Sequence, residues 1–172
     1  RCCTASWRRM NDTNMPPRVK ISGNYVNSIL AKTEAVMAGF DEGIMLNQDG
    51  SVSEGTGENL FLVIDGKIHT PSLENNILTG ITRDSVFNLI RNELGLDVIE
   101  RPIDRSEIYL ADEMFLTGTA AHVTPVGELD NRKIGLGGVG PVTEKLSSIY
   151  AKVIRGEKKE YLDWCTPISI HS

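Results

Sequence analysis

Cysteine, aromatic side chains and clustered positive charge are all scarce in this sequence. Its three cysteines are Cys2, Cys3 and Cys165, and their spacing suits neither a disulfide framework nor a Cys-x-x-Cys zinc site. We therefore predict free thiols in a reducing compartment, the cytoplasm. The three histidines show no metal-ligand spacing either, so we predict no metal site.

Long apolar runs are also absent. No stretch approaches the roughly 20 consecutive apolar residues of a membrane span. The net charge is −5, from 18 Lys and Arg against 23 Asp and Glu, and the basic residues are scattered along the chain. A nucleic-acid interface needs clustered Lys and Arg. The sequence therefore predicts neither a membrane nor a nucleic-acid partner.

The chain does have enough apolar sequence for one domain. With 172 residues, of which 40% are hydrophobic, it would bury roughly 70% of its unfolded surface. Predicted hairpins outnumber strand–helix–strand units, which favours an α+β fold. The predicted strands are 2–9, 43–46, 51–54, 59–64, 67–70, 97–103, 113–117 and 121–129, and the predicted helices are 24–38, 82–94, 105–110 and 141–155.

Several of these boundaries rest on particular residues. Asp65-Gly66 is the strongest short-range signal for a two-residue hairpin turn. Thr82 is a good N-cap for the second helix, which would end at Gly95. Pro141 suits the first turn of the last helix, which would stop at Gly156. The first helix has the spacing of an amphipathic helix. The residues on its apolar face are Val26, Ile29, Leu30, Thr33 and Met37.

Two short stretches carry residues suited to one chemistry. In the first, Lys20 lies just ahead of a helix and Tyr25 follows five residues later, and in the second, Glu54 lies in a Gly-rich turn. A lysine can form a Schiff base, an acid can protonate a pyridine nitrogen, and a phenol can bond a ring oxygen. These are the groups that pyridoxal phosphate needs from a protein.

Other residues compete for these roles on chemistry alone. The rival lysines include Lys32, Lys67, Lys133 and Lys145, and surface lysines are the ordinary case. The apolar flank of Lys20 and the Gly-Asn-Tyr that follows it favour a pocket partly shielded from water, which would make its amine more nucleophilic. Glu58 rivals Glu54, and spacing alone does not separate the two.

A series of short motifs extends these two stretches along the chain, from about residue 6 to residue 155. They are Ser6–Arg9, Pro16–Lys20, Gly23–Tyr25, Glu54–Phe61, Leu78–Asp84, Ala111–Phe115, Gly118–Ala121, Thr124–Val126 and Gly140–Thr143. In this order and spacing, the whole chain resembles the large C-terminal domain of the branched-chain amino acid aminotransferases, which belong to the fold type IV pyridoxal-phosphate enzymes. The resemblance implies the D-amino acid aminotransferase-like fold, with a mostly antiparallel, barrel-like core and flanking helices.

The resemblance also implies roles for individual residues. Lys20 would hold the cofactor and move the proton at the substrate Cα, Glu54 would bond the ring nitrogen, and Tyr25 would lie near the ring oxygen and the substrate. The supporting neighbours would be Glu58 and Asn59. The cofactor phosphate would lie at Gly80, Ile81, Thr82, Gly118 and Thr119, with Leu78 against the ring. Thr119 and Ala120 would offer backbone amides to the substrate carboxylate.

The reaction implied is amino-group transfer between leucine, isoleucine or valine and 2-oxoglutarate, giving branched-chain 2-oxo acids and glutamate. The resemblance also implies a homodimer or a higher homo-oligomer. Another fold type IV enzyme, a D-amino acid aminotransferase or an aminodeoxychorismate lyase, is the nearest alternative. The Gly-Glu-Asn-Leu-Phe run after Glu54 and the Gly-Thr-Ala-Ala turn favour the branched-chain enzymes.

The start of the chain sets a further expectation. Because Arg1 opens directly into a predicted strand, we expect residues 1–10 to continue from an N-terminal part that is absent here. Residues 11–17 would then be an interdomain linker-like loop, and residues 18–172 the cofactor-binding domain. Without the small N-terminal domain, such a fragment would fold but catalyse poorly or not at all.

Two local features are weaker signals. The run Gly135–Gly140 matches a dinucleotide-binding pattern, but that pattern needs a long buried strand before it, and only residues 132–134 precede it here. His122 follows the Gly-Thr-Ala-Ala turn where members of the resembled family more often carry an acidic residue. That difference would either tune the mouth of the pocket or have no effect.

Overall fold

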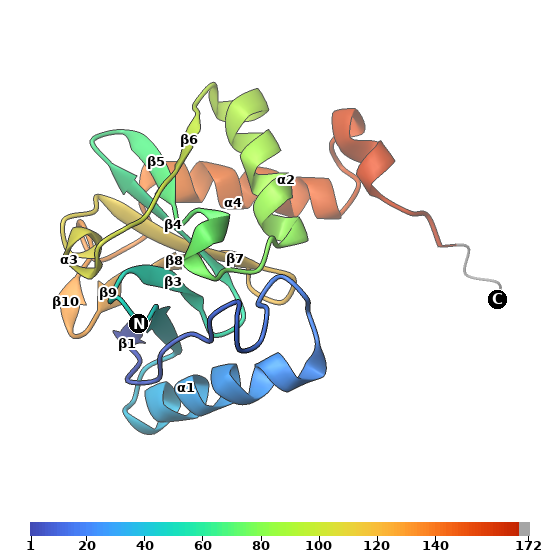
Figure 1. Ribbon diagram of the computed structural model, residues 1–172. Helices are drawn as coiled ribbons and strands as arrows, with labels where there is room; N and C mark the ends of the chain where they lie inside the picture. The colour runs from blue at the N-terminus through green and yellow to red at the C-terminus, as the bar shows by residue number, and fades with distance from the viewer. Residues whose placement is uncertain (169–172) are drawn as a thin grey trace.

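The computed structural model describes residues 1–168, so the end of the predicted 18–172 domain lies outside the described residues. The strands of residues 1–168 form two five-stranded sheets, ordered β10–β9–β1–β2–β3 and β6–β5–β4–β7–β8 (Figure 1). The strands are β1 Cys2–Thr4, β2 Glu42–Leu46, β3 Val52–Gly55, β4 Asn59–Ile64, β5 Lys67–Thr70, β6 Val98–Glu100, β7 Glu113–Gly118, β8 His122–Val126, β9 Glu128–Leu129 and β10 Arg132–Lys133.

Four α-helices accompany these sheets in the described part of the chain. They are α1 Tyr25–Met37, α2 Ile81–Leu89, α3 Arg105–Ile108 and α4 Pro141–Ile154. Short 3₁₀ turns at Ser22–Asn24, Leu73–Asn75 and Lys159–Trp164 and a π-turn at Ile90–Leu94 complete the described elements. No helix of residues 1–168 has the length and apolar character that crossing a membrane requires.

The α+β class is confirmed, but the predicted barrel-like core is not. Both sheets are mixed, because β1 pairs in parallel with β2 and β9, and β5 pairs in parallel with β6. Within residues 1–168 they do not close into a barrel. The reason lies in the tight turn between β3 and β4, where the Gly55 amide donates to the Glu58 carbonyl at 2.8 Å. After this turn the chain leaves the first sheet and enters the second.

The core has two layers that share strand β4. Alternate side chains of a strand point to opposite faces of its sheet. Leu60 and Leu62 of β4 therefore pack between the two sheets, whereas Phe61 and Val63 pack on the opposite face, which α2 and α4 cover (Figure 1). All four side chains are buried, so β4 is the central element of the molecule.

Three predicted strands are shorter than their sequence patterns. The strand predicted over 2–9 ends at Thr4, although the Arg9 amide still donates to Leu46 O at 2.8 Å after an intervening bend. The strand predicted over 97–103 is only β6. The strand predicted over 121–129 divides into β8 and β9 around Gly127, which lies so close to Gly137 O that an added Cβ would be 2.8 Å from it.

The predicted helices are close to the observed ones, with two corrections. Thr82 is not the N-cap of α2, because Gly80 precedes the helix with φ 69°, and Thr82 lies in the first turn. Helix α1 packs through its small residues Ser28, Ala31 and Ala35. The predicted apolar face points outward instead, since Met37 is 84% exposed. Small side chains let the helix approach β2 closely, which a face of large residues would prevent.

Candidate active site

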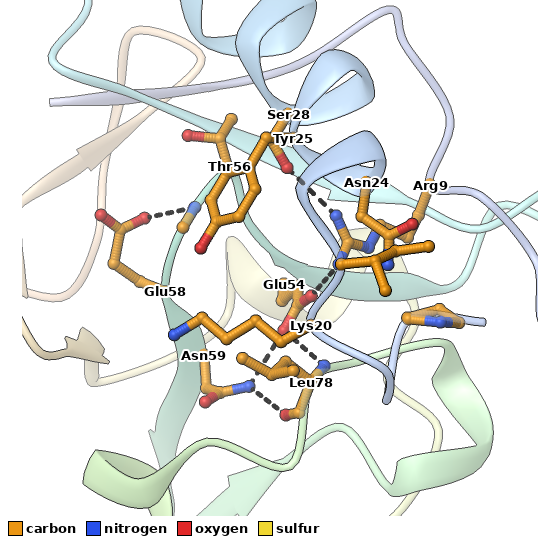
Figure 2. A pocket seen from close by; sticks show the side chains of 13 residues that line it. Arg9, Lys20, Asn24, Tyr25, Ser28, Glu54, Thr56, Glu58, Asn59 and Leu78 are labelled. Atoms are coloured by element: carbon orange, nitrogen blue, oxygen red, sulfur yellow. Dashed lines mark hydrogen bonds and ion pairs between the residues drawn. The ribbon is translucent and has the colours of Figure 1, made fainter. Parts of the chain in front are cut away.

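A pocket lies where the β3–β4 turn, the loop before α1 and the segment after β5 meet (Figure 2). Six residues predicted from the sequence line it: Lys20, Tyr25, Glu54, Glu58, Asn59 and Leu78. Four further lining residues had no role in the sequence-based prediction, namely Arg9, Asn24, Ser28 and Thr56. The tight β3–β4 turn is what brings the residues of both strands to one wall of the pocket.

Lys20 and Tyr25 extend into the pocket from the loop and from the first residue of α1 (Figure 2). Within residues 1–168 no hydrogen bond or ion pair engages the Lys20 amine, so it is free to react with a ligand. Lys20 is exposed, which differs from the expected shielding from water. The difference arises because its loop forms the open rim of the pocket, where Tyr25 is also 46% exposed.

Glu54 is the buried acid of the pocket, with 4% of its surface exposed. Its Oε2 accepts hydrogen bonds from Asn59 Nδ2 and from the Leu78 amide, both at 3.0 Å. Its Oε1 lies 2.6 Å from Arg9 Nη2. Burial raises the pKa of Glu54 to about 7, whereas the Arg9 charge and the Leu78 amide act in the opposite direction. Glu54 thus titrates near neutral pH while its carboxylate is held by three donors.

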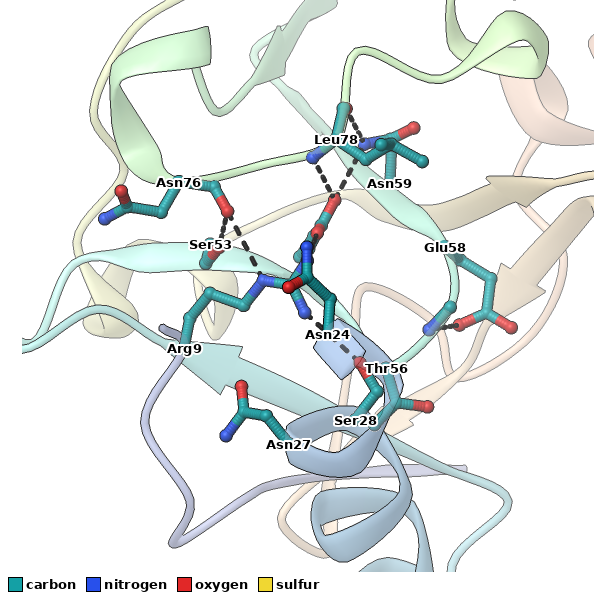
Figure 3. Close-up of polar contacts among 12 residues, drawn as sticks. Arg9, Asn24, Asn27, Ser28, Ser53, Thr56, Glu58, Asn59, Asn76 and Leu78 are labelled. Atoms are coloured by element: carbon teal, nitrogen blue, oxygen red, sulfur yellow. Dashed lines mark hydrogen bonds and ion pairs between the residues drawn. The ribbon is translucent and has the colours of Figure 1, made fainter. Parts of the chain in front are cut away.

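Arg9 is the site residue that the sequence reasoning missed. It follows the bend after β1, and its side chain is 7% exposed (Figure 3). Besides Glu54, the guanidinium contacts Ser28 Oγ at 3.2 Å and the Asn76 carbonyl at 3.3 Å. Arginine is almost never fully buried without a partner. The available signal was therefore an arginine beside a strand, but the sequence does not say which acid it meets.

Glu58, the rival of Glu54, has a different environment on the opposite side of the pocket. Its Oε2 accepts a hydrogen bond from the Gly57 amide at 3.0 Å (Figure 2). Burial and the charge of Glu42 raise the pKa of Glu58. Glu42 in turn pairs with Lys32 at 2.6 Å and accepts a hydrogen bond from Thr56 Oγ1. Lys32, a rival lysine, is therefore already engaged.

Asn59 links the acid to the start of α2. Its Nδ2 bonds both Glu54 Oε2 and the Leu78 carbonyl, at 3.0 and 2.8 Å. Its Oδ1 lies where a Cβ on Gly80 would stand, at 2.1 Å. Gly80 and Ile81 line a second, shallow hollow beside the first pocket. The first amides of a helix have no intrahelical partner, so this end of α2 can receive an anion.

The remaining predicted residues lie at the end of β7. Gly118 packs against the β3–β4 turn, since a Cβ there would be 3.4 Å from Glu58 Cγ. Thr119 and Ala120 form the exposed β7–β8 turn and do not line the main pocket. His122 is exposed, has φ 55° and lies 5.9 Å from Tyr150, measured between ring centroids. Thr82 is buried in the first turn of α2.

Comparisons with known proteins agree with this geometry. The family model described as amino-transferase class IV matches residues 1–129. A probable branched-chain-amino-acid aminotransferase of Aquifex aeolicus is 55% identical over 168 residues, which are 98% of this chain and 54% of that protein. The branched-chain-amino-acid aminotransferase of Pseudomonas aeruginosa is 45% identical over 163 residues, 95% of this chain and 52% of that protein. The chain thus spans about half the length of the curated relatives it matches.

Solved structures show the same relationship. The branched-chain amino acid aminotransferase of Thermobaculum terrenum in its PLP form superposes with a TM-score of 0.95 at 46% identity, covering 98% of this chain and 55% of that one. The branched-chain aminotransferase of the archaeon Thermoproteus uzoniensis with norvaline gives a TM-score of 0.92 at 46% identity, covering 97% of this chain and 55% of that one. Since the family model matches most of the sequence and the fold agrees throughout, this chain belongs to the amino-transferase class IV family.

Proposed function

We propose that this chain binds pyridoxal 5'-phosphate and serves the transfer of amino groups between branched-chain amino acids and 2-oxoglutarate. One observation carries the proposal. A lysine amine without a partner in the described chain shares a pocket with a buried carboxylate that three donors hold in place. The names of the relatives support the reaction class, since they are branched-chain-amino-acid aminotransferases.

The residues of the pocket fit this cofactor. An amine, a phenol and a buried acid come from Lys20, Tyr25 and Glu54, and the open end of α2 lies beside them. Asn24 Oδ1 is also buried without a hydrogen-bond partner in the described chain, so the pocket still has an acceptor to offer. When bound, pyridoxal phosphate supplies a ring that withdraws electrons from the substrate Cα.

Each residue would have a defined action. Lys20 would hold the cofactor through its amine and, once released, move the proton at the substrate Cα, a step typically worth about 10²–10⁴-fold in rate. Glu54 would hold the proton on the ring nitrogen, because a cation beside a carboxylate favours its ionised form. Leu78 would pack against the ring, and the amides of Ile81 and Thr82 would face the phosphate.

The substrates follow from the relatives rather than from the pocket itself. One solved branched-chain amino acid aminotransferase was obtained with an N-(5'-phosphopyridoxyl)-L-glutamate adduct and another with 4-methylvaleric acid, an analogue of the leucine carbon skeleton. These support glutamate and a branched-chain substrate as the two exchange partners. A cytoplasmic location, a homodimer, and the division into a linker-like loop at 11–17 and a cofactor-binding part from residue 18 stay predictions. Residues 1–10 nevertheless contribute Arg9 to the same pocket.

Adding pyridoxal phosphate to the chain tests the first half of the proposal. Borohydride reduction followed by peptide mapping should place the pyridoxyl label on Lys20. Lys20→Ala should lose the label, whereas Lys67→Ala should keep it, because Lys67 is an exposed residue at the hairpin turn after β4. A label on any other lysine in the unmodified sequence would contradict the assignment.

Product analysis tests the second half. Leucine and 2-oxoglutarate should yield the branched-chain 2-oxo acid and glutamate in equal amounts. Use of D-alanine in preference to leucine would indicate a D-amino acid aminotransferase. A 2-oxo acid product without glutamate formation would indicate lyase chemistry instead.

A further inference from the structure

Arg9 occupies a fully engaged position behind the acid of the pocket. All three nitrogens of its guanidinium have partners, and the partners come from three parts of the chain: Glu54 on β3, Ser28 on α1 and the Asn76 carbonyl before Leu78 (Figure 3). Its backbone is fixed as well, since the Arg9 amide donates to Leu46 O at 2.8 Å. The guanidinium therefore cannot turn away from Glu54 without breaking several bonds.

The position matters because most of the surroundings of Glu54 favour the neutral acid. Burial disfavours a carboxylate, and the negative charge of Glu58 acts in the same direction. Arg9 and, at longer range, Arg83 oppose them. Lys20 and Tyr25 line the same pocket, but neither has a hydrogen bond or ion pair to Glu54 within residues 1–168. Arg9 is thus the cation in direct contact with the acid.

We infer that Arg9 is a positioning residue, which keeps the Glu54 carboxylate ionised and aimed into the pocket so that it can hold the proton of the cofactor ring. The last part of this inference rests on the proposed function, whereas the control of Glu54 by Arg9 does not. A protonated Glu54 would have no negative charge to offer to the ring nitrogen. Loss of Arg9 would therefore impair the site without removing any group that touches the cofactor.

The geometry also explains why this residue is an arginine. The planar guanidinium reaches a carboxylate, a hydroxyl and a carbonyl in three directions at once. A lysine in its place would keep the charge but would lose the fixed direction of the contacts. We therefore expect Arg9→Lys to shift Glu54 less than Arg9→Met does, and to leave its orientation less well defined.

An infrared titration of the cofactor-free chain tests the first part. The carboxylic acid stretch that disappears in Glu54→Gln identifies Glu54. In Arg9→Met the midpoint of this band should rise by about one pH unit or more, because an opposite charge in contact shifts a carboxyl by that amount. Ser28→Ala, which removes one anchor of Arg9 on a helix that tolerates alanine, should give a smaller rise. Arg101→Met, which breaks an ion pair with Glu107 away from the pocket, should give none.

A titration midpoint that is unchanged in Arg9→Met would overturn the inference. If that variant does not fold, an unchanged midpoint in both Ser28→Ala and Arg9→Lys would overturn it equally. Because no cofactor is present, this result does not depend on the proposed function.

Cofactor binding tests the second part through a double-mutant cycle. Arg9→Met should weaken binding of pyridoxal phosphate at least several-fold at neutral pH, and should weaken it little further in a Glu54→Gln background. Additive losses would mean that Arg9 supports the fold rather than Glu54. If no variant and not even the unmodified chain binds the cofactor, the proposed function fails while the infrared result stands.

Discussion

At the scale of single residues, Glu54 combines two opposing influences. Burial favours its neutral form, whereas Arg9, Asn59 and the Leu78 amide all donate to its oxygens. A cofactor with a protonated ring nitrogen would add a second cation and so favour the carboxylate further. Glu54 is therefore poised to respond to the ligand, which an exposed glutamate would not be.

Replacing Glu54 by glutamine should separate attachment of the cofactor from turnover. Lys20 would still be labelled by borohydride, since its amine is untouched, but transamination should fall by on the order of 10²-fold or more because a neutral amide holds the ring proton poorly. Turnover is measured with the form of the protein that transaminates leucine. Rates near those of the unmodified protein would rule out the role of Glu54.

The same residue should make stability depend on pH. The folded-state pKa of about 7 lies above the ordinary value of 4.5, so between these values the folded chain binds more protons than the unfolded chain. The free energy of unfolding should therefore fall as pH rises from 4.5 to 7, by roughly 3 kcal/mol at most. Urea unfolding of the cofactor-free chain at several pH values measures this slope. Glu54→Gln should flatten it, and an identical slope in that variant would argue against a raised pKa.

At the scale of elements, the first turn of α2 depends on one glycine. Gly80 has φ 69°, and an added Cβ would lie 2.1 Å from Asn59 Oδ1. Asn59 in turn bonds Glu54 and the Leu78 carbonyl. The ring-nitrogen acid and the proposed phosphate end of α2 are therefore coupled through a single amide side chain.

Gly80→Ala should disturb both ends of this coupling. We expect a loss of stability of more than about 1 kcal/mol from backbone strain, plus a further loss from the clash with Asn59, and weaker binding of pyridoxal phosphate. Gly39→Ala is the matched control, because Gly39 has φ 83° but nothing within 4 Å of an added Cβ. Equal stability and equal affinity in the two variants would show that the contact with Asn59 does not matter.

At the scale of the whole molecule, β4 joins the two core layers. Leu62 faces the layer between the sheets and Phe61 faces the layer under α2 and α4, and both are fully buried. Neither layer can lose its order while the other keeps β4 intact. The two layers should therefore unfold as one cooperative unit.

Leu62→Ala tests this coupling. The cavity should cost about 2–5 kcal/mol and lower the whole transition together, as followed by far-UV circular dichroism and by fluorescence of Trp7 and Trp164, which lie near opposite ends of the described chain. Leu136→Ala, at a fully exposed position, is the control and should change little. Separate transitions from the two probes would mean that the layers unfold independently.

The features that depend on local backbone preferences could be predicted from the amino acids alone. The hairpin at Asp65-Gly66 is present with φ 50° and 72°, and α4 runs from Pro141 nearly to Gly156, as predicted. Left-handed turns and helix ends need particular residues at particular positions, whatever surrounds them. The motifs around Lys20 and Glu54 likewise indicated the family, because they are short and contiguous.

Which distant groups meet became clear only from the folded arrangement. The sequence shows Arg9 and Glu54 but not their ion pair, and it shows Gly127 but not the close approach of Gly137 that separates β8 from β9. It also placed the large apolar residues of α1 on one face, whereas the helix packs through Ser28, Ala31 and Ala35. Pairing, close approach and burial depend on how whole elements pack together. No local pattern of residues encodes that packing.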